Sequence, residues 1–195
     1  LILSESINYV NVGRYCFQTT FLNERYHEYF EHKNGHKIIW VLRNPFSVIY
    51  SMIYNWRRFA LDELFESCAV PTLIDPYKTR YEKFGLWGIG KFYRACFAYR
   101  EKTRQVLKIK DYLNDNLMVI DCDNLIRNKD EILCSIYKFI DLPFKPEYSK
   151  IIHDKSINKA HSFSQTKGEI VEELCVPIYA EAKKLILCNY SAKIF

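Results

Sequence analysis

The sequence has no long hydrophobic run and contains few glycines and prolines. None of its apolar stretches approaches the roughly 20 residues that a membrane-spanning helix requires, and no charged-then-apolar segment typical of an export signal opens the chain. Only 6 glycines and 6 prolines occur among 195 residues, and they form no linker. These absences predict a single domain over residues 1–195 with no membrane segment in this chain.

Cysteine pairs and cysteine–histidine clusters are also missing. The 7 cysteines are scattered, with no C-x-x-C spacing and no histidine at zinc-ligand distance. We therefore predict reduced, mostly buried thiols and no bound metal. Reduced thiols favour a cytoplasmic location. A lone N-glycosylation sequon at Asn189–Ser191 leaves open a Golgi-lumen enzyme whose N-terminal anchor has been lost.

A strong excess of charge of either sign is absent. The 28 Lys+Arg and 23 Asp+Glu residues are interleaved and give a formal net charge of +5. This balance excludes a protein whose whole surface binds nucleic acid, but it permits a local anion site. The composition is 49% hydrophobic, and a chain of this length buries roughly 70% of its unfolded surface, so it needs no disulfide or metal to fold.

Two short apolar runs have the pattern of buried strands. Residues 37–42 read KIIWVL and end at Arg43-Asn44-Pro45, and residues 116–121 read NLMVID. Apolar residues at three-to-four spacing predict helices over four further ranges: 46–58, 88–113, 129–140 and 169–187. Strands joined through helices indicate an α/β fold with a parallel sheet core flanked by helices.

The first candidate site follows the first of these strands. Ligands of open α/β sheets bind at the carboxyl ends of the strands, where Arg43 stands, with Ser51 two turns into the following helix. A guanidinium fork and a hydroxyl directed at one point are able to hold a phosphate. The alternative is that Arg43 pairs with a nearby carboxylate and that Ser51 bonds a carbonyl of its own helix.

The same segment resembles a known cofactor motif. Residues 38–51 read IIWVLRNPFSVIYS, which is similar to the apolar strand, Arg-Asp/Asn-Pro and later Ser of sulfotransferases that use 3′-phosphoadenosine 5′-phosphosulfate (PAPS). In that family the Arg and the Ser bind the 3′-phosphate of the cofactor. The resemblance therefore implies that Arg43 and Ser51 bind PAPS.

Further segments resemble the same family in the same order. Residues 118–125 (MVIDCDNL) are similar to its strand ending in Tyr-Glu-Asp-Leu, and residues 132–143 to its Leu-x-x-Ile-x-x-Phe-Leu-Gly-Leu-Pro pattern. Residues 4–9 (SESINY) resemble the Glu-Lys-Ser-x-Asn-Tyr segment of the glycan N-sulfotransferase branch, in which the Glu is the proposed base. The carboxylate of Glu5 is displaced by one residue from that pattern, and Cys122 replaces a Tyr that contacts adenine in cytosolic members.

The resemblance implies a PAPS-dependent sulfotransferase with the family's P-loop-type α/β fold. The implied reaction moves a sulfuryl group to a hydroxyl or amine of a small-molecule or glycan acceptor, without a metal. Glu5 is the candidate base, and Lys167 and Gly168 occupy the region of the family's basic loop that closes over the cofactor. The family's first strand and phosphosulfate-binding loop have no counterpart here, so we expect the chain to be a C-terminal portion of the domain.

Two other functions remain open from the sequence. Residues 85–91 (GLWGIGK) satisfy the G-x-x-x-x-G-K pattern, which predicts a P-loop phosphotransferase using Gly90 and Lys91. Against it, Phe92 stands where a Ser or Thr would bind magnesium, and the bulky Trp87 stands where backbone amides would wrap a phosphate. The second alternative is a non-catalytic relative that keeps the fold without turnover.

Overall fold

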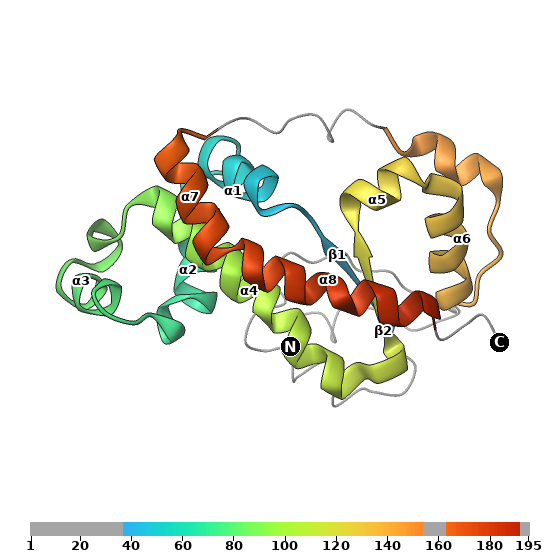
Figure 1. Ribbon diagram of the computed structural model, residues 1–195, viewed down its shortest axis with the longest axis horizontal. Helices are drawn as coiled ribbons and strands as arrows, with labels where there is room; N and C mark the ends of the chain where they lie inside the picture. The colour runs from blue at the N-terminus through green and yellow to red at the C-terminus, as the bar shows by residue number, and fades with distance from the viewer. Residues whose placement is uncertain (1–36, 154–162, 192–195) are drawn as a thin grey trace, which may run out of the picture.

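A pair of parallel strands lies at the centre of the protein in the computed structural model, which describes residues 37–153 and 163–191 (Figure 1). Strand β1 (Ile38–Leu42) pairs with β2 (Leu117–Asp121), and the register runs from Ile38 opposite Leu117 to Leu42 opposite Asp121. Every residue of β2 is buried, as expected of a strand covered on both faces. Both predicted strands and the α/β class are confirmed.

The chain crosses from β1 to β2 through a series of helices. In order these are α1 (Pro45–Tyr54), α2 (Arg58–Cys68), η2 (Val70–Thr72), α3 (Tyr77–Phe84), η3 (Gly85–Gly88), α4 (Lys91–Leu113) and η4 (Asn114–Asn116). The long helix predicted over 88–113 is confirmed as α4. The helix predicted over 46–58 ends earlier, at Tyr54, and the sequence pattern predicts neither α2 nor α3.

Beyond β2 the chain continues in helices. These are α5 (Cys122–Arg127), α6 (Lys129–Phe139), η5 (Pro146–Ile151), α7 (Gln165–Leu174) and α8 (Val176–Ser191). The helix predicted over 129–140 is confirmed as α6, but the single helix predicted over 169–187 is wrong, because the structure breaks it at Cys175. Pro177 explains the break, since it lacks the N–H of a helix interior and is tolerated in a first turn.

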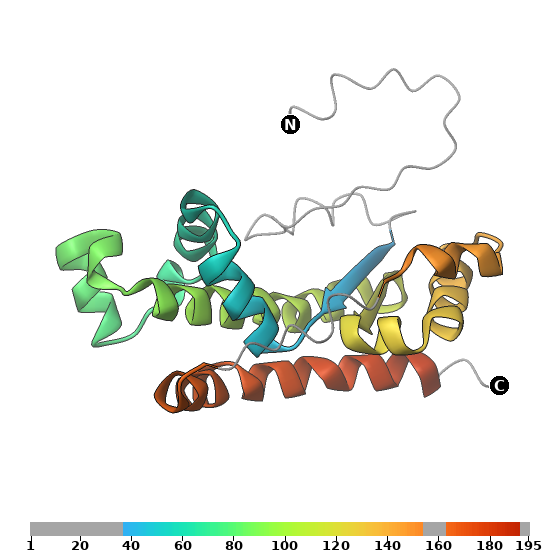
Figure 2. The same ribbon diagram turned by 90° about the horizontal axis from the view of Figure 1, so that it is seen from above.

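Helix α4 packs in two of the three core clusters that the described residues form. In its first half, Ala95, Cys96 and Tyr99 pack with residues of α1 and α2. Farther along, Val106 and Ile109 pack with both strands and with α8. Figure 2 shows α8 running along α4 beside the strands. None of the helices in the described part of the chain is long and apolar enough to cross a membrane.

A buried ion pair joins two of the crossover helices. Arg94 of α4 is 4% exposed. Its Nη1 donates to the Leu86 carbonyl (2.7 Å), and its Nη2 lies 3.2 Å from Oδ1 of Asp62 on α2. The exposed Arg58 also pairs with Asp62, at 3.6 Å. Arg94 is buried and bonds both Leu86 and Asp62, whereas Arg58, which also pairs with Asp62, is exposed, so Arg94 stabilises the packing of α2 on α4 more than Arg58 does.

We expect Arg94→Ala to lower the free energy of unfolding by about 1.5 to 3 kcal/mol, since it removes the charged donor of the Leu86 carbonyl and leaves the Asp62 carboxylate only the exposed Arg58. Arg58→Ala is the matched control, because it removes an exposed partner of the same carboxylate and should cost less than about 1 kcal/mol. Urea unfolding of both variants measures the difference. Equal losses would show that the buried pair does not hold α2 against α4.

Candidate functional site

The carboxyl ends of β1 and β2 lie side by side, and the residue that follows each strand carries a reactive or charged side chain. Leu42 and Asp121 form the last pair of the ladder, so Arg43 and Cys122 leave the sheet at the same edge. Both side chains are half-buried there. This is the edge at which α/β sheets bind ligands.

Arg43 and Ser51 belong to one rigid unit. Asn44 caps α1, because its Oδ1 accepts a hydrogen bond from the Phe46 N–H (2.9 Å), and a proline occupies the first helical position. Ser51 lies on the second turn of α1 and is half-buried. Its hydroxyl accepts a long hydrogen bond from Asn55 Nδ2 (3.5 Å). The cap thus fixes the path from Arg43 to the helix that carries Ser51.

The Cys122 thiol is sensitive to the charge of Arg43. Burial raises the pKa of Cys122, and the positive charge of Arg43 opposes that rise. The carboxylates of Asp123 and Asp121 add to the rise. The guanidinium of Arg43 therefore acts on the end of β2 as well as on its own strand.

Asp121 is a structural carboxylate at this edge. It is 6% exposed and caps α5 by accepting a hydrogen bond from the Asn124 N–H (2.9 Å). It also accepts a hydrogen bond from the Tyr179 hydroxyl of α8 (2.8 Å), and Lys183 Nζ lies 3.7 Å away. Burial and this hydrogen bond raise the pKa of Tyr179, so the phenol stays protonated. The oxygens of Asp121 hold α5 and α8 to the sheet.

Lys167 and Gly168 lie in a helix rather than in the expected loop. Both fall in the first turn of α7, where the Gly168 N–H donates to the Ser164 carbonyl (2.9 Å). The Lys167 ammonium stands over the ring of Phe92, 5.5 Å from its centroid. The helical hydrogen bond removes the Gly168 N–H from the donors that a phosphate could use.

An aromatic cluster brings this turn of α7 to α1. The ring of Phe163 lies 5.7 Å from Phe92, 6.0 Å from Tyr50 and 6.4 Å from Phe46, centroid to centroid. Tyr50 directly precedes Ser51 on α1. The cluster therefore holds the start of α7, and with it Lys167, next to the helix that carries Ser51.

The G-x-x-x-x-G-K match does not form a phosphate loop. It follows α3 rather than a strand, and the Lys91 ammonium donates to the Ile53 carbonyl at the end of α1. Gly85 ends α3 with a positive φ of 57°, and a Cβ on Gly88 would lie 2.2 Å from the Arg80 carbonyl oxygen. The glycines allow a turn and a close approach, and the lysine serves a helix end, so the P-loop alternative is wrong for this segment.

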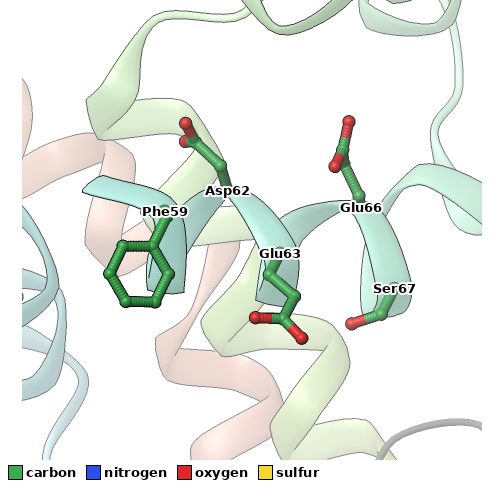
Figure 3. A pocket seen from close by; sticks show the side chains of 5 residues that line it. All are labelled: Phe59, Asp62, Glu63, Glu66 and Ser67. Atoms are coloured by element: carbon green, nitrogen blue, oxygen red, sulfur yellow. The ribbon is translucent and has the colours of Figure 1, made fainter. Parts of the chain in front are cut away.

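A shallow cavity on α2 and the nearby Trp87 lie apart from the strand ends. The cavity is lined from α2 alone by Phe59, Asp62, Glu63, Glu66 and Ser67 (Figure 3). Its carboxylates disfavour an anion. Trp87 is 84% exposed, and the Arg58 guanidinium stands 5.1 Å from its ring. The Trp87 ring therefore lies outside the core.

Sequence reasoning and structure differ on which residues surround Arg43. Glu5, the candidate base, lies outside the described residues. Tyr99, which the apolar spacing of α4 assigns only to the core, donates its hydroxyl to the Arg43 carbonyl (2.8 Å). Tyr179 likewise reaches the edge of the sheet through Asp121. No local signal marks either tyrosine, because each meets its partner from a distant part of the chain.

Most of the chain matches one known protein family. A family model described as "Sulfotransferase domain" matches residues 25–177. A solved structure, a sulfotransferase domain from the curacin biosynthetic pathway, matches with 18% identity and a TM-score of 0.41 over 58% of this chain. The chain spans 32% of the length of that structure. No curated protein matches this chain. On the extent of the family match, the chain belongs to the sulfotransferase domain family.

Proposed function

We propose that this protein moves a sulfuryl group from PAPS to a hydroxyl or amine acceptor, and that Arg43 and Ser51 hold the 3′-phosphate of PAPS. The observation that carries the proposal is the place of Arg43. It is the first residue beyond β1, at the ligand-binding edge of the sheet, in a chain of the sulfotransferase family. Ser51 follows on the helix that Arg43 introduces.

The chemistry of these side chains fits a phosphate. Arg43 carries a planar fork of N–H donors, Ser51 carries a hydroxyl, and Lys167 carries a second cation. The buried carboxylate at this edge, Asp121, already accepts hydrogen bonds from Asn124 and Tyr179. A guanidinium, a hydroxyl and an ammonium are groups that suit an anionic ligand.

Lys167 and Gly168 remain proposed cofactor residues, in different roles. The aromatic cluster supports Lys167, because it places the first turn of α7 beside the helix of Ser51. Gly168 would leave space for the cofactor rather than donate a hydrogen bond to it. Its N–H is engaged within α7. Apart from its chain neighbours and the backbone of its own helix, none of the described atoms lies within 4 Å of the position that a Cβ would take.

PAPS supplies the sulfuryl group in this reaction and leaves as adenosine 3′,5′-bisphosphate. We propose that Glu5 takes the proton from the acceptor hydroxyl or amine, which makes that atom nucleophilic. Arg43 and Ser51 keep the nucleotide in one orientation, so that the acceptor meets it in line. Arg43 and Ser51 therefore bind the nucleotide, and Glu5, in another part of the chain, removes the proton from the acceptor.

A glycan acceptor is the class that the exposed Trp87 supports. Its ring is 84% exposed, and a large aromatic face offers apolar contact area to a sugar ring. The neighbouring Arg58 guanidinium would attract an acidic sugar. Trp56 is half-buried and packs against the core, so we assign it no acceptor role.

A cytoplasmic location is part of the same proposal. The described cysteines with defined side chains, Cys68, Cys96, Cys122, Cys134 and Cys175, are all free thiols. A reducing compartment keeps thiols in this state. A Golgi-lumen enzyme is the alternative.

Arg43→Ala should weaken binding of adenosine 3′,5′-bisphosphate far more than binding of 5′-AMP, because only the first nucleotide carries the 3′-phosphate. Each hydrogen bond lost to a charged group should cost about 1.5 to 3 kcal/mol. Calorimetry on the full-length protein measures both affinities. Arg80→Ala removes an equal charge from the exposed surface of α3 and is the control. An equal loss for both nucleotides in Arg43→Ala would remove Arg43 from this role.

Glu5→Gln should lower turnover by about 10²- to 10⁴-fold, the usual contribution of a general base, without changing nucleotide affinity or the melting temperature. Sulfuryl transfer to an aminosugar acceptor by the full-length protein is the assay. Glu172→Gln, an exposed carboxylate of α7, is the control. Unchanged turnover in Glu5→Gln would move the base to another residue.

Lys91→Ala should leave the affinity for adenosine 3′,5′-bisphosphate within tenfold, about 1.4 kcal/mol, because the ammonium already serves the Ile53 carbonyl. Loss of this contact at the end of α1 should lower stability by up to about 1 kcal/mol. Titration with the bisphosphate and with magnesium ATP, beside a Lys78→Ala control on α3, separates the two functions. If Lys91→Ala loses more than tenfold in affinity for the bisphosphate at an unchanged melting temperature, the P-loop phosphotransferase is favoured again.

A further inference from the structure

A buried tyrosine of α4 holds the backbone of Arg43. Tyr99 is 5% exposed and lies in the core cluster with Ile49 and Ala95. Its hydroxyl donates a hydrogen bond of 2.8 Å to the Arg43 carbonyl. This contact joins the middle of the crossover, at α4, to the exit of β1.

The Arg43 carbonyl lies where the sheet no longer fixes the chain. Among the described residues the ladder between β1 and β2 stops at Leu42 opposite Asp121. One residue further, Asn44 is fixed by its cap on α1. Arg43 links these two fixed points, and the Tyr99 hydroxyl supplies a hydrogen bond to its carbonyl.

The Tyr99 hydroxyl remains a hydrogen-bond donor over the physiological pH range. Burial raises the pKa of Tyr99 well above its ordinary value, which outweighs an opposing hydrogen bond with Thr103. The phenol therefore stays protonated throughout the physiological pH range. Close packing around a ring with this little exposure leaves the hydroxyl few other positions.

We propose that Tyr99 is a positioning residue that sets the direction of the Arg43 guanidinium toward a 3′-phosphate. The backbone of Arg43 determines where its Cβ points, so a hydrogen bond that fixes the carbonyl also fixes the start of the side chain. Pre-set donors bind an anion without the cost of ordering them first. This inference rests on the proposed function for its ligand, but its geometry is independent of any ligand.

Cys122 makes the geometry measurable without a nucleotide. Its thiol is half-buried at the end of β2, and the charged groups that act on it are Arg43, Asp123 and Asp121. The positive charge of Arg43 lowers the pKa of Cys122 against the effect of burial. If Arg43 turns away, the pKa of Cys122 must rise, and alkylation of its thiol at mildly alkaline pH must slow.

The test uses Tyr99→Phe in the full-length protein, which removes the hydroxyl and keeps the ring. Peptide-resolved alkylation with iodoacetamide as a function of pH titrates Cys122, and calorimetry compares adenosine 3′,5′-bisphosphate with 5′-AMP. Both are measured at a temperature at which circular dichroism shows the variant folded. Arg43→Ala is the positive control. Tyr81→Phe is the matched negative control, because it removes a hydroxyl that donates to Glu66 (3.1 Å) away from the strand ends.

We expect Tyr99→Phe to raise the pKa of Cys122, in the direction of Arg43→Ala, and to reduce the preference for the bisphosphate about tenfold, or about 1.4 kcal/mol. Tyr81→Phe should change neither. An unchanged Cys122 titration in Tyr99→Phe overturns the positioning role whatever the nucleotide data show. A shifted titration with an unchanged preference overturns the role in phosphate binding. A wild-type protein without any preference for the bisphosphate refutes the proposed function instead, and the Cys122 titration still decides whether Tyr99 positions Arg43.

Discussion

The parallel pairing of β1 with β2 is the constraint on which the rest of the structure depends. It sets Leu42 opposite Asp121, and because both strands run in the same direction, Arg43 and Cys122 leave the sheet at one edge. Parallel strands cannot be joined by a tight turn, so the chain needs a long crossover, and α1 to α4 supply it. Helix α4 then returns the chain along the sheet to the start of β2.

Two tyrosine hydroxyls hold the carboxyl ends of the two strands. The Tyr99 hydroxyl of α4 holds the Arg43 carbonyl, and the Tyr179 hydroxyl of α8 holds the Asp121 carboxylate. Burial raises the pKa of both phenols, so both remain donors at physiological pH. Helix α4 therefore holds the end of β1, and helix α8 holds the end of β2. The Asp121 oxygens are engaged within the fold, and the planar fork of N–H donors on Arg43 has the chemistry that suits an anion.

The sequence predicts the strands, α4 and α6 correctly, because their apolar patterns continue over the whole element and match what is buried. It misses α2, because charged residues alternate with the buried Leu61 and Phe65 and the pattern is too short to stand out. It also misses the break at Cys175, since apolar spacing continues across it and only Pro177 marks the boundary. For the candidate site, the sequence identifies Arg43 but neither Tyr99 nor Tyr179, which hold the strand ends.

By itself the sequence determined the local unit in which an apolar strand ends at Arg43, Asn44 caps the next helix and Ser51 follows on that helix. Each step depends on residues close in the chain, so the pattern carries the structure. Only the tertiary structure decided that Lys91 serves a helix end instead of a phosphate and that Tyr99 holds Arg43. A donor's partner is whichever acceptor the fold places within about 3 Å, and the register of the sheet and the packing of distant helices determine that acceptor.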